Sequence, residues 1–178
     1  MSRLVVLGGQ ESGVGAAMLA QQRGVDAFVS DAGVMRPKYR DLLKSRGIAF
    51  EEGGHTAARV LEADEIVKSP GIPDSAALVR AAREQGIPVI SEIEFAWRYC
   101  KGRVVGITGS NGKTTTTLLT HHILQRAGLD VAVGGNVGNS FAGLIAAGDN
   151  AWYVLELSSF QLDGIRDFRP RVAMLLNI

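Results

Sequence analysis

The sequence has little cysteine, few aromatic residues and no excess of charge of either sign. Its 178 residues include one cysteine, Cys100, so an internal disulfide is impossible and a reducing compartment such as the cytoplasm is expected. The 19 basic and 18 acidic side chains leave a net charge of +1, and the basic residues are scattered along the chain. A protein that binds nucleic acid or an anionic membrane normally carries a basic patch, so the sequence predicts neither partner.

Long apolar runs are also missing. The first apolar run covers residues 4–7 and ends at Gly8 and Gly9, which makes it too short for a signal peptide. No other run approaches the roughly 20 apolar residues that cross a bilayer. A cytoplasmic protein is therefore predicted, and its length suits one large domain or two small ones.

Glycine is abundant, with 22 residues that fall mostly at the ends of short apolar segments. Strands are expected at 4–7, 27–30, 48–50, 65–68, 88–90, 104–108, 130–133, 153–157 and 172–176. Between them, helices are expected up to residue 23 and at 37–46, 56–61, 75–85, 92–99, 118–127 and 140–147. This alternation predicts an α/β fold with parallel sheets. We expect a Rossmann-like domain over residues 1–100, followed over 101–178 by the first part of a P-loop ATPase-type parallel-sheet domain.

Residues 104–115 read VVGITGSNGKTT and have the layout of a phosphate-binding loop: a β-branched run, a glycine-rich turn, and Lys-Thr before a helical segment. Backbone N–H groups of such a turn converge on an anion. Lys113 can bind the β- and γ-phosphates, and the Thr114 hydroxyl can ligate Mg²⁺. Ile107 replaces the first glycine of the usual pattern, and an ordinary corner with a surface lysine is the alternative. The predicted ATP-binding residues are Gly109, Ser110, Asn111, Gly112, Lys113, Thr114 and Thr115.

Glu156 lies near the end of the strand expected at 153–157. A carboxylate at the carboxyl end of a strand beside a phosphate loop can reach Mg²⁺, directly or through water, although an ion pair with a nearby basic residue is the alternative. Lys113 and Glu156 are the predicted catalytic residues, and Thr114 and Glu156 are the predicted Mg²⁺ ligands. His121 and His122 point about 100° apart on a helix and cannot form a joint metal site.

The N-terminal segment has the order of a nucleotide-binding βαβ unit: strand, glycine turn, helix, strand and then the carboxylate Asp31. Gln10 stands where the middle glycine of a dinucleotide fingerprint belongs, which weakens that interpretation. Asp31 can still accept from a ribose hydroxyl or a base, and a plain corner with a solvated Asp31 is the alternative. The rigid corner at 69–73 (SPGIP) ends another expected strand, where open α/β sheets bind ligands; a rigid turn without a ligand is equally open.

Together these segments resemble the Mur ligases, the ATP-dependent amide-forming enzymes of peptidoglycan precursor synthesis. The loop at 107–115 is similar to theirs, including the missing glycine, as are residues 134–138 (GGNVG) and 155–162 (LELSSFQL). Within the family, the run at 158–162 resembles the branch that adds D-glutamate to UDP-N-acetylmuramoyl-L-alanine, and residues 69–72 are similar to the first domain of that branch.

The resemblance implies an ATP-dependent ligase that works through an acyl phosphate, with ATP and Mg²⁺ as cofactors and UDP-N-acetylmuramoyl-L-alanine and D-glutamate as substrates. The implied residues for the uridine diphosphate are Glu11, Ser12, Asp31, Ser69, Pro70 and Gly71. Those implied for the sugar and lactyl-alanine part are Asn136, Ser158, Ser159 and Gln161. Another Mur or folate-type ligase, and a nucleotide-binding module without chemistry, remain alternatives.

The enzymes of this family are far longer than 178 residues and close a third domain over ATP. The chain is therefore expected to be an N-terminal portion that binds a uridine nucleotide but is inactive alone. The last expected strand contains the fully apolar run 174–176, so self-association through an uncovered sheet is also expected.

Overall fold

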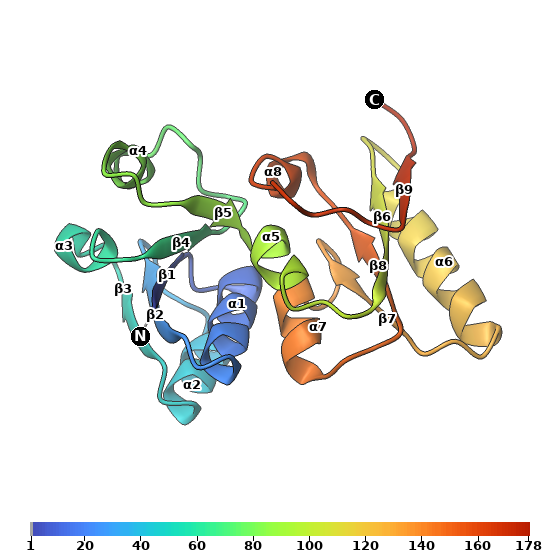
Figure 1. Ribbon diagram of the computed structural model, residues 1–178, viewed down its shortest axis with the longest axis horizontal. Helices are drawn as coiled ribbons and strands as arrows, with labels where there is room; N and C mark the ends of the chain where they lie inside the picture. The colour runs from blue at the N-terminus through green and yellow to red at the C-terminus, as the bar shows by residue number, and fades with distance from the viewer. Residues whose placement is uncertain (1) are drawn as a thin grey trace.

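The computed structural model describes residues 2–178 and contains two sheets, one on each side of a central group of helices (Figure 1). All strand pairs within the two sheets are parallel. The α/β fold expected from the sequence is therefore confirmed.

The first sheet has the strand order β3-β2-β1-β4-β5. Its strands are β1 (Arg3–Leu7), β2 (Asp26–Asp31), β3 (Ala49–Glu52), β4 (Glu65–Lys68) and β5 (Val89–Ser91). The helices of this half are α1 (Glu11–Gln22), α2 (Pro37–Ser45), α3 (Ala57–Val60), α4 (Ala77–Glu84) and α5 (Glu92–Trp97). The order reverses beside β1, whose neighbours are β2 and β4, and such a reversal opens a crevice at the carboxyl ends of the strands.

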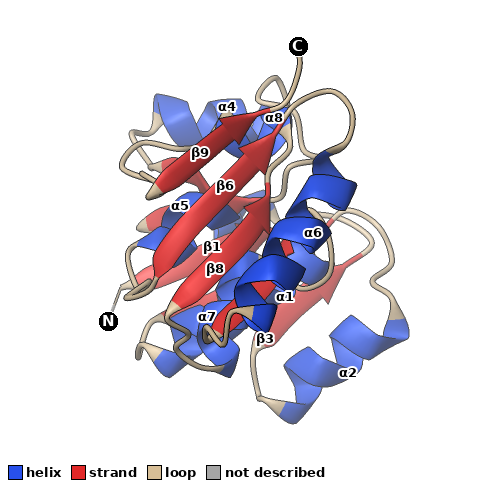
Figure 2. Ribbon diagram, turned by 90° about the vertical axis from the view of Figure 1, so that its right-hand side faces the viewer, coloured by secondary structure: helices blue, strands red, loops and turns tan. Residues whose placement is uncertain are grey.

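The second sheet has the order β7-β8-β6-β9, with β6 next to both β8 and β9. Its strands are β6 (Arg103–Thr108), β7 (Val131–Gly135), β8 (Trp152–Glu156) and β9 (Val172–Leu175). Its helices are α6 (Lys113–Arg126), α7 (Phe141–Ala147) and α8 (Ser159–Leu162). Figure 2 shows α6 lying across one face of this sheet.

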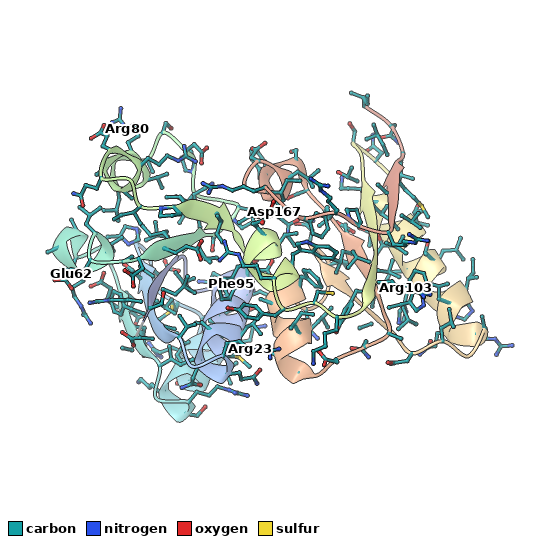
Figure 3. The ribbon with its side chains drawn as sticks, viewed as in Figure 1. Arg23, Glu62, Arg80, Phe95, Arg103 and Asp167 are labelled. Carbon is teal, nitrogen blue, oxygen red and sulfur yellow. The ribbon has the colours of Figure 1, made fainter. Side chains whose placement is uncertain are left out.

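Helices α1, α5 and α7 fill the space between the two sheets (Figure 1). One apolar cluster runs through them and includes Leu4 and Val6 of β1 as well as Tyr153 and Leu155 of β8. Phe95 of α5 is 2% exposed and lies in the centre of this layer (Figure 3). Because parallel strands buried on both faces are apolar almost throughout, the short β-branched runs of the sequence become the strands of this double-sided core.

The structure differs from the sequence-based expectation in two helices. α6 begins at Lys113 rather than at residue 118, because Gly112 caps it with a left-handed φ of +79° and its first turn starts directly after the loop. The short helix α8 was not predicted, although Ser158 caps it in the usual way. Among the helices described here, none has the length and apolar content needed to cross a membrane.

Candidate functional site

The predicted phosphate loop connects β6 to α6. After β6 ends at Thr108, Gly109 and Gly112 take φ values of +142° and +79°, which glycine adopts without a steric penalty. Since α6 begins at Lys113, the unpaired N–H groups of its first turn open toward the loop. The local geometry is therefore that of an anion-binding turn before a helix.

Asn177, which follows β9, braces this loop. Its Oδ1 accepts from the Asn111 N–H (2.8 Å), its backbone oxygen accepts from the Ser110 N–H (3.2 Å), and its Nδ2 donates to the Asn111 carbonyl (3.1 Å). β9 pairs in parallel with β6, so both strands deliver their following residues to the same edge. No local motif marks Asn177 in the sequence, because its partner is 66 residues away.

The Lys113 ammonium lies over the same loop. Its Nζ donates to the carbonyl oxygens of Gly109 (2.6 Å) and Ser110 (3.1 Å). These three residues line a cavity of about 500 Å³ together with Ser159 and Phe160. A phosphate oxygen entering this cavity would compete with neutral carbonyls for a cationic donor, and charge-assisted hydrogen bonds are the stronger ones.

Glu156, at the end of β8, lies next to the loop. It is 3% exposed, and its carboxylate accepts from the Thr114 hydroxyl (2.7 Å) and from the Asn136 side-chain amide (2.8 Å). β8 pairs with both β6 and β7, so the carboxyl ends of the three strands meet there. The structure thus brings Lys113, Thr114 and Glu156 to one edge of the sheet.

The oxygen ligands at this edge fit Mg²⁺ bound together with a nucleotide. Across residues 2–178 no group of three or more His, Cys, Asp or Glu side chains could hold a metal ion alone. Thr114 and Glu156 offer a hydroxyl and a carboxylate, and Mg²⁺ typically takes one or two protein oxygens, with phosphates and water completing its shell.

A second cavity, of about 580 Å³, crosses the carboxyl ends of the first sheet. It is lined by all six residues predicted for uridine diphosphate, namely Glu11, Ser12, Asp31, Ser69, Pro70 and Gly71. His55, from the segment between β3 and α3, also lines it and was not predicted. One cavity is therefore lined by the glycine turn after β1, by the carboxylate of Asp31 and by the corner at residues 69–73.

Asp31 braces the glycine turn of this cavity. Its two carboxylate oxygens accept from the N–H groups of Gly9 (2.6 Å) and Gly33 (2.8 Å). A Cβ on Gly9 would lie 2.1 Å from the Met35 sulfur, so a larger residue would force the buried Met35 side chain to move. Each oxygen of an ionised carboxylate has a second lone pair, so Asp31 can still accept from a ligand.

The Glu11 carboxylate is bound to two other helices. It accepts from the Tyr39 hydroxyl of α2 (2.7 Å) and from the Ser140 N–H before α7 (3.4 Å). Glu11 therefore connects the rim of the first-sheet cavity to the second half of the chain.

A third cavity, of about 540 Å³, lies between the other two and includes Asn136 in its wall. It shares Pro70 and Gly71 with the first-sheet cavity, and Ser158 and Phe160 with the phosphate-loop cavity. The three cavities are therefore contiguous, and they extend from the carboxyl ends of the first sheet to the phosphate loop.

Gln161 is 2% exposed and braces the short helix α8. Its side-chain oxygen accepts from the Ser158 N–H (2.9 Å), while the Ser158 hydroxyl accepts from the Gln161 N–H (3.3 Å), which together form a capping box. Ser158 borders two of the cavities and Ser159 borders the phosphate-loop cavity. Gln161 itself is not among the lining residues of the cavities described above.

Two family models match most of the chain. Residues 2–91 match the Mur ligase MurD-like N-terminal domain, and residues 107–178 match the Mur ligase middle domain. Similar curated proteins carry the name UDP-N-acetylmuramoylalanine–D-glutamate ligase. The protein from Bacteroides fragilis is 56% identical over 178 residues, and that from Porphyromonas gingivalis W83 is 57% identical over 175. These matches include all and 98% of this chain but 40% and 39% of the relatives, so the chain spans about 40% of their length.

Solved structures of peptide ligases share the fold. The UDP-N-acetylmuramate:L-alanyl-γ-D-glutamyl-meso-diaminopimelate ligase from Neisseria meningitides superposes with a TM-score of 0.66 at 25% identity, covering 99% of this chain and 60% of that one. A pseudomurein peptide ligase type C from Methanothermus fervidus gives a TM-score of 0.53 at 30% identity, covering 89% of this chain and 33% of that one.

Proposed function

The chain belongs to the Mur ligase family, and we propose that it forms the substrate- and nucleotide-binding part of an ATP-dependent ligase. The reaction would join D-glutamate to UDP-N-acetylmuramoyl-L-alanine in peptidoglycan precursor synthesis, as the names of the 56–57% identical relatives suggest. The observation that carries the proposal is the 2.7 Å contact between Thr114 and Glu156 beside Lys113 at the phosphate loop.

The proposed enzyme divides into two domains with separate tasks. Residues 1–100 would bind the uridine diphosphate in the first-sheet cavity, and residues 101–178 would bind ATP at the phosphate loop. The cavity between them would hold the sugar and lactyl-alanine part of the substrate, with Asn136 and Ser158 in its wall. Because the three cavities adjoin, the substrate carboxylate could reach the γ-phosphate of ATP.

The chemistry would proceed in two steps. A carboxylate oxygen of the alanyl group attacks the γ-phosphorus of ATP, so that an acyl phosphate forms and ADP leaves. The D-glutamate amine then attacks the acyl carbon and expels inorganic phosphate, giving the amide. Lys113 would bind the phosphate oxygens as negative charge accumulates between the two anions, since fixed donors aimed at developing charge stabilise a transition state.

Thr114 and Glu156 would hold Mg²⁺ with the nucleotide, and the ion would supply charge neutralisation at the phosphates. The Thr114 hydroxyl donates its proton to Glu156, so the lone pairs of its oxygen would remain available to the ion, while Asn136 keeps the carboxylate oriented. The cytoplasm is the expected site of the reaction, where cell-wall precursors are made for cell shape and division. Neither nucleic acid nor a membrane is an expected partner.

Calorimetric titrations with MgATP and with UDP-N-acetylmuramoyl-L-alanine test this proposal. In Lys113→Ala, the affinity for MgATP should fall roughly 10- to 100-fold, the usual effect of losing a charged hydrogen-bond donor, while the affinity for the UDP substrate should stay unchanged. Lys101→Ala is the matched control, because Lys101 is 74% exposed and contacts Asp149.

The same substitutions in the full-length protein test the reaction itself. Phosphate release that depends on both D-glutamate and the UDP substrate should occur in the parent and in Lys101→Ala, and should be lost in Lys113→Ala and Glu156→Gln. Equal MgATP affinity in Lys113→Ala and Lys101→Ala would show that the loop does not bind ATP phosphates. Turnover with a different amino acid in place of D-glutamate would identify another member of the family.

A further inference from the structure

A chain of hydrogen bonds holds His55 at the rim of the first-sheet cavity. Ser30 of β2 is fully buried, and its Oγ lies 2.6 Å from Oε1 of Glu51 on β3 and 2.7 Å from Nδ1 of His55. Glu51 also accepts from the Thr56 N–H at 2.8 Å. The imidazole is therefore anchored through one edge to two neighbouring strands of the sheet.

The direction of the protons in this chain follows from Glu51. Burial raises the pKa of its carboxyl, but hydrogen bonds from Ser30 and Thr56 and the charge of Arg59 outweigh burial and leave the pKa lowered. An ionised carboxylate can only accept, so the single Ser30 proton is donated to Glu51. The Ser30 oxygen then accepts from Nδ1–H of His55, and in the neutral imidazole Nε2 is left as an acceptor.

The edge of the imidazole that carries Nε2 is the part left for the cavity, because the Nδ1 edge is bound to Ser30. The cavity runs across the carboxyl ends of neighbouring strands. Ser69 follows β4 and the glycine turn follows β1, while Asp31 ends β2 and His55 comes after β3. An anion belongs at the turn before α1. In folds of this type an acidic residue at the end of the second strand faces the ribose, so His55 lies on the nucleoside side.

We propose that His55 binds the nucleoside half of the ligand in this cavity, accepting at Nε2 a hydrogen bond from an N–H or O–H donor. Ser30 and Glu51 are positioning residues that fix which ring nitrogen is the acceptor. The inference rests on the proposed function, which makes the ligand a uridine nucleotide. Uridine offers two kinds of donor, the imide N–H of the base and the ribose hydroxyls. If the imide is the partner, His55 favours uracil over cytosine, whose N3 carries no hydrogen.

Calorimetric titration of UDP tests the role of His55. His55→Phe keeps an aromatic ring of similar size and removes both nitrogens, and it should weaken UDP binding roughly 3- to 10-fold, the usual effect of one neutral hydrogen bond. His122→Phe makes the same chemical change on the exposed side of α6 and should leave the affinity unchanged. Absence of UDP binding to the parent would overturn the proposed function as well. Tight binding that is equal in the parent and His55→Phe would overturn this inference alone.

Three analogues identify the donor: 3-methyl-UDP, 2′-deoxy-UDP and 3′-deoxy-UDP. The parent protein should bind the analogue that lacks the donor more weakly than it binds UDP. The His55→Phe variant has already lost the hydrogen bond, so it should bind that analogue at least as tightly as UDP. Losses of the same size in the parent and in His55→Phe for all three analogues would contradict a hydrogen bond to His55.

Ser30→Ala tests the positioning role. It frees Nδ1, so the ring can take either neutral tautomer, and UDP binding should weaken by less than in His55→Phe. In the His55→Phe background the same change should have no further effect on affinity. If Ser30→Ala weakens binding equally in both backgrounds, Ser30 acts on the cavity by a route that does not involve His55.

Discussion

Glu92 is a carboxyl group buried between the two halves of the chain. It is 2% exposed, its Oε1 accepts from the Ala142 N–H in the first turn of α7, and its Oε2 has no hydrogen-bond partner within the described residues. Burial raises the pKa of Glu92 to about 7, the nearby charge of Glu11 adds to the rise, and the Ala142 N–H opposes it. At neutral pH this group therefore titrates inside the folded protein.

Glu92→Gln should remove a pH dependence of stability. The pKa of Glu92 is about 7 in the folded protein and near the ordinary 4.5 of a glutamate in the unfolded chain, so the folded state binds more protons between these two pH values. The free energy of unfolding should then fall as pH rises from about 4.5 to 7, by about 3 kcal/mol in total. Glutamine mimics the protonated carboxyl and should abolish this fall. Urea denaturation between pH 5 and 8 measures it.

The control for this experiment is Glu84→Gln, which changes an exposed carboxylate at the end of α4. It should keep the pH dependence of the parent. A slope that persists in Glu92→Gln would assign the titration to another group.

Glu94 is 1% exposed and holds the segment between α8 and β9. Its carboxylate accepts from the N–H groups of Arg166 (2.8 Å), Asp167 (3.1 Å) and Phe168 (3.1 Å). Asp167 lies in this segment above the central helices (Figure 3). A single buried acceptor from the first half of the chain thus orders a segment of the second half.

Glu94→Gln should destabilise the fold by about 2–4 kcal/mol, because one carboxamide oxygen cannot satisfy three N–H groups and its NH₂ group meets donors. Hydrogen exchange should accelerate first at residues 166–168, and urea denaturation should give the loss of stability. The exposed Glu84→Gln variant again serves as the control. Unchanged exchange at 166–168 would mean that Glu94 is not what orders this segment.

At the scale of elements, apolar runs and glycines predicted the strands and most helices, because buried parallel strands carry their signal locally. The two helices that differ from the expectation, α6 and α8, begin at the local caps Gly112 and Ser158, which a search for apolar runs does not detect. Partners that are distant in the sequence also alter local motifs. Ser91 and Glu94 have the spacing of a capping box, and Ser91 caps α5, but the Glu94 side chain accepts from residues 166–168 instead of closing the box. The capping box forms at α8 instead, where Ser158 and Gln161 have no such competitor.

The candidate site also contains residues that the sequence indicated and residues that it did not. The phosphate loop and Glu156 could be found from the sequence, because a glycine turn and a strand-end carboxylate are local patterns. Asn177 and His55 could not, since their roles depend on which strands become neighbours. Asn177 reaches Asn111 only because β9 pairs with β6, and His55 reaches Ser30 only because β3 pairs with β2.

The contact between α1 and α7 depends on a glycine. A Cβ on Gly15 would lie 2.1 Å from the Ser140 hydroxyl and 2.8 Å from the Gly143 nitrogen. Alanine is normally the better helix former by about 1 kcal/mol. Here the helices would have to separate to make room for the Cβ. The cost of this separation should exceed the gain in helix propensity, so the substitution should lower the stability.

Gly15→Ala should therefore destabilise the protein by about 1–3 kcal/mol, as overpacking of a filled interface usually does. Thermal and urea denaturation measure the change. Gly33→Ala is the control, because a Cβ there would make only an ordinary contact of 3.5 Å with Asp31. Stabilisation by Gly15→Ala would show that the two helices can separate at little cost.

At the scale of the whole molecule, apolar side chains remain uncovered on the outer side of the second half. Leu118, Leu119 and Ile123 of α6 are 46–57% exposed, and Val172 and Leu175 of β9 are 41% and 62% exposed. Surfaces of this kind tend to be covered by another protein surface. The self-association expected from the sequence stays a prediction, with a second copy of the chain as the partner.

Sedimentation velocity at increasing concentration tests this self-association. The parent should form dimers or larger species at high micromolar concentration, and the double variant Leu119→Lys/Ile123→Lys should sediment as a monomer. Val34→Lys is the control, because Val34 is 76% exposed but belongs to the first half of the chain. A parent that sediments as a clean monomer at several hundred micromolar would refute the prediction.

The two sheets should unfold together. A shared apolar cluster joins β1 to β8 through α1, α5 and α7, and Glu11, Glu92 and Glu94 of the first half accept hydrogen bonds from the second. Opening one half would expose this apolar layer and leave buried groups without partners, so a half-unfolded state is costly. The calorimetric and van't Hoff enthalpies should therefore agree, and the most protected amides of β1 and β8 should exchange with equal free energies of opening. Two separate transitions, or a lower opening free energy in one sheet, would mean that the central helices do not couple the halves.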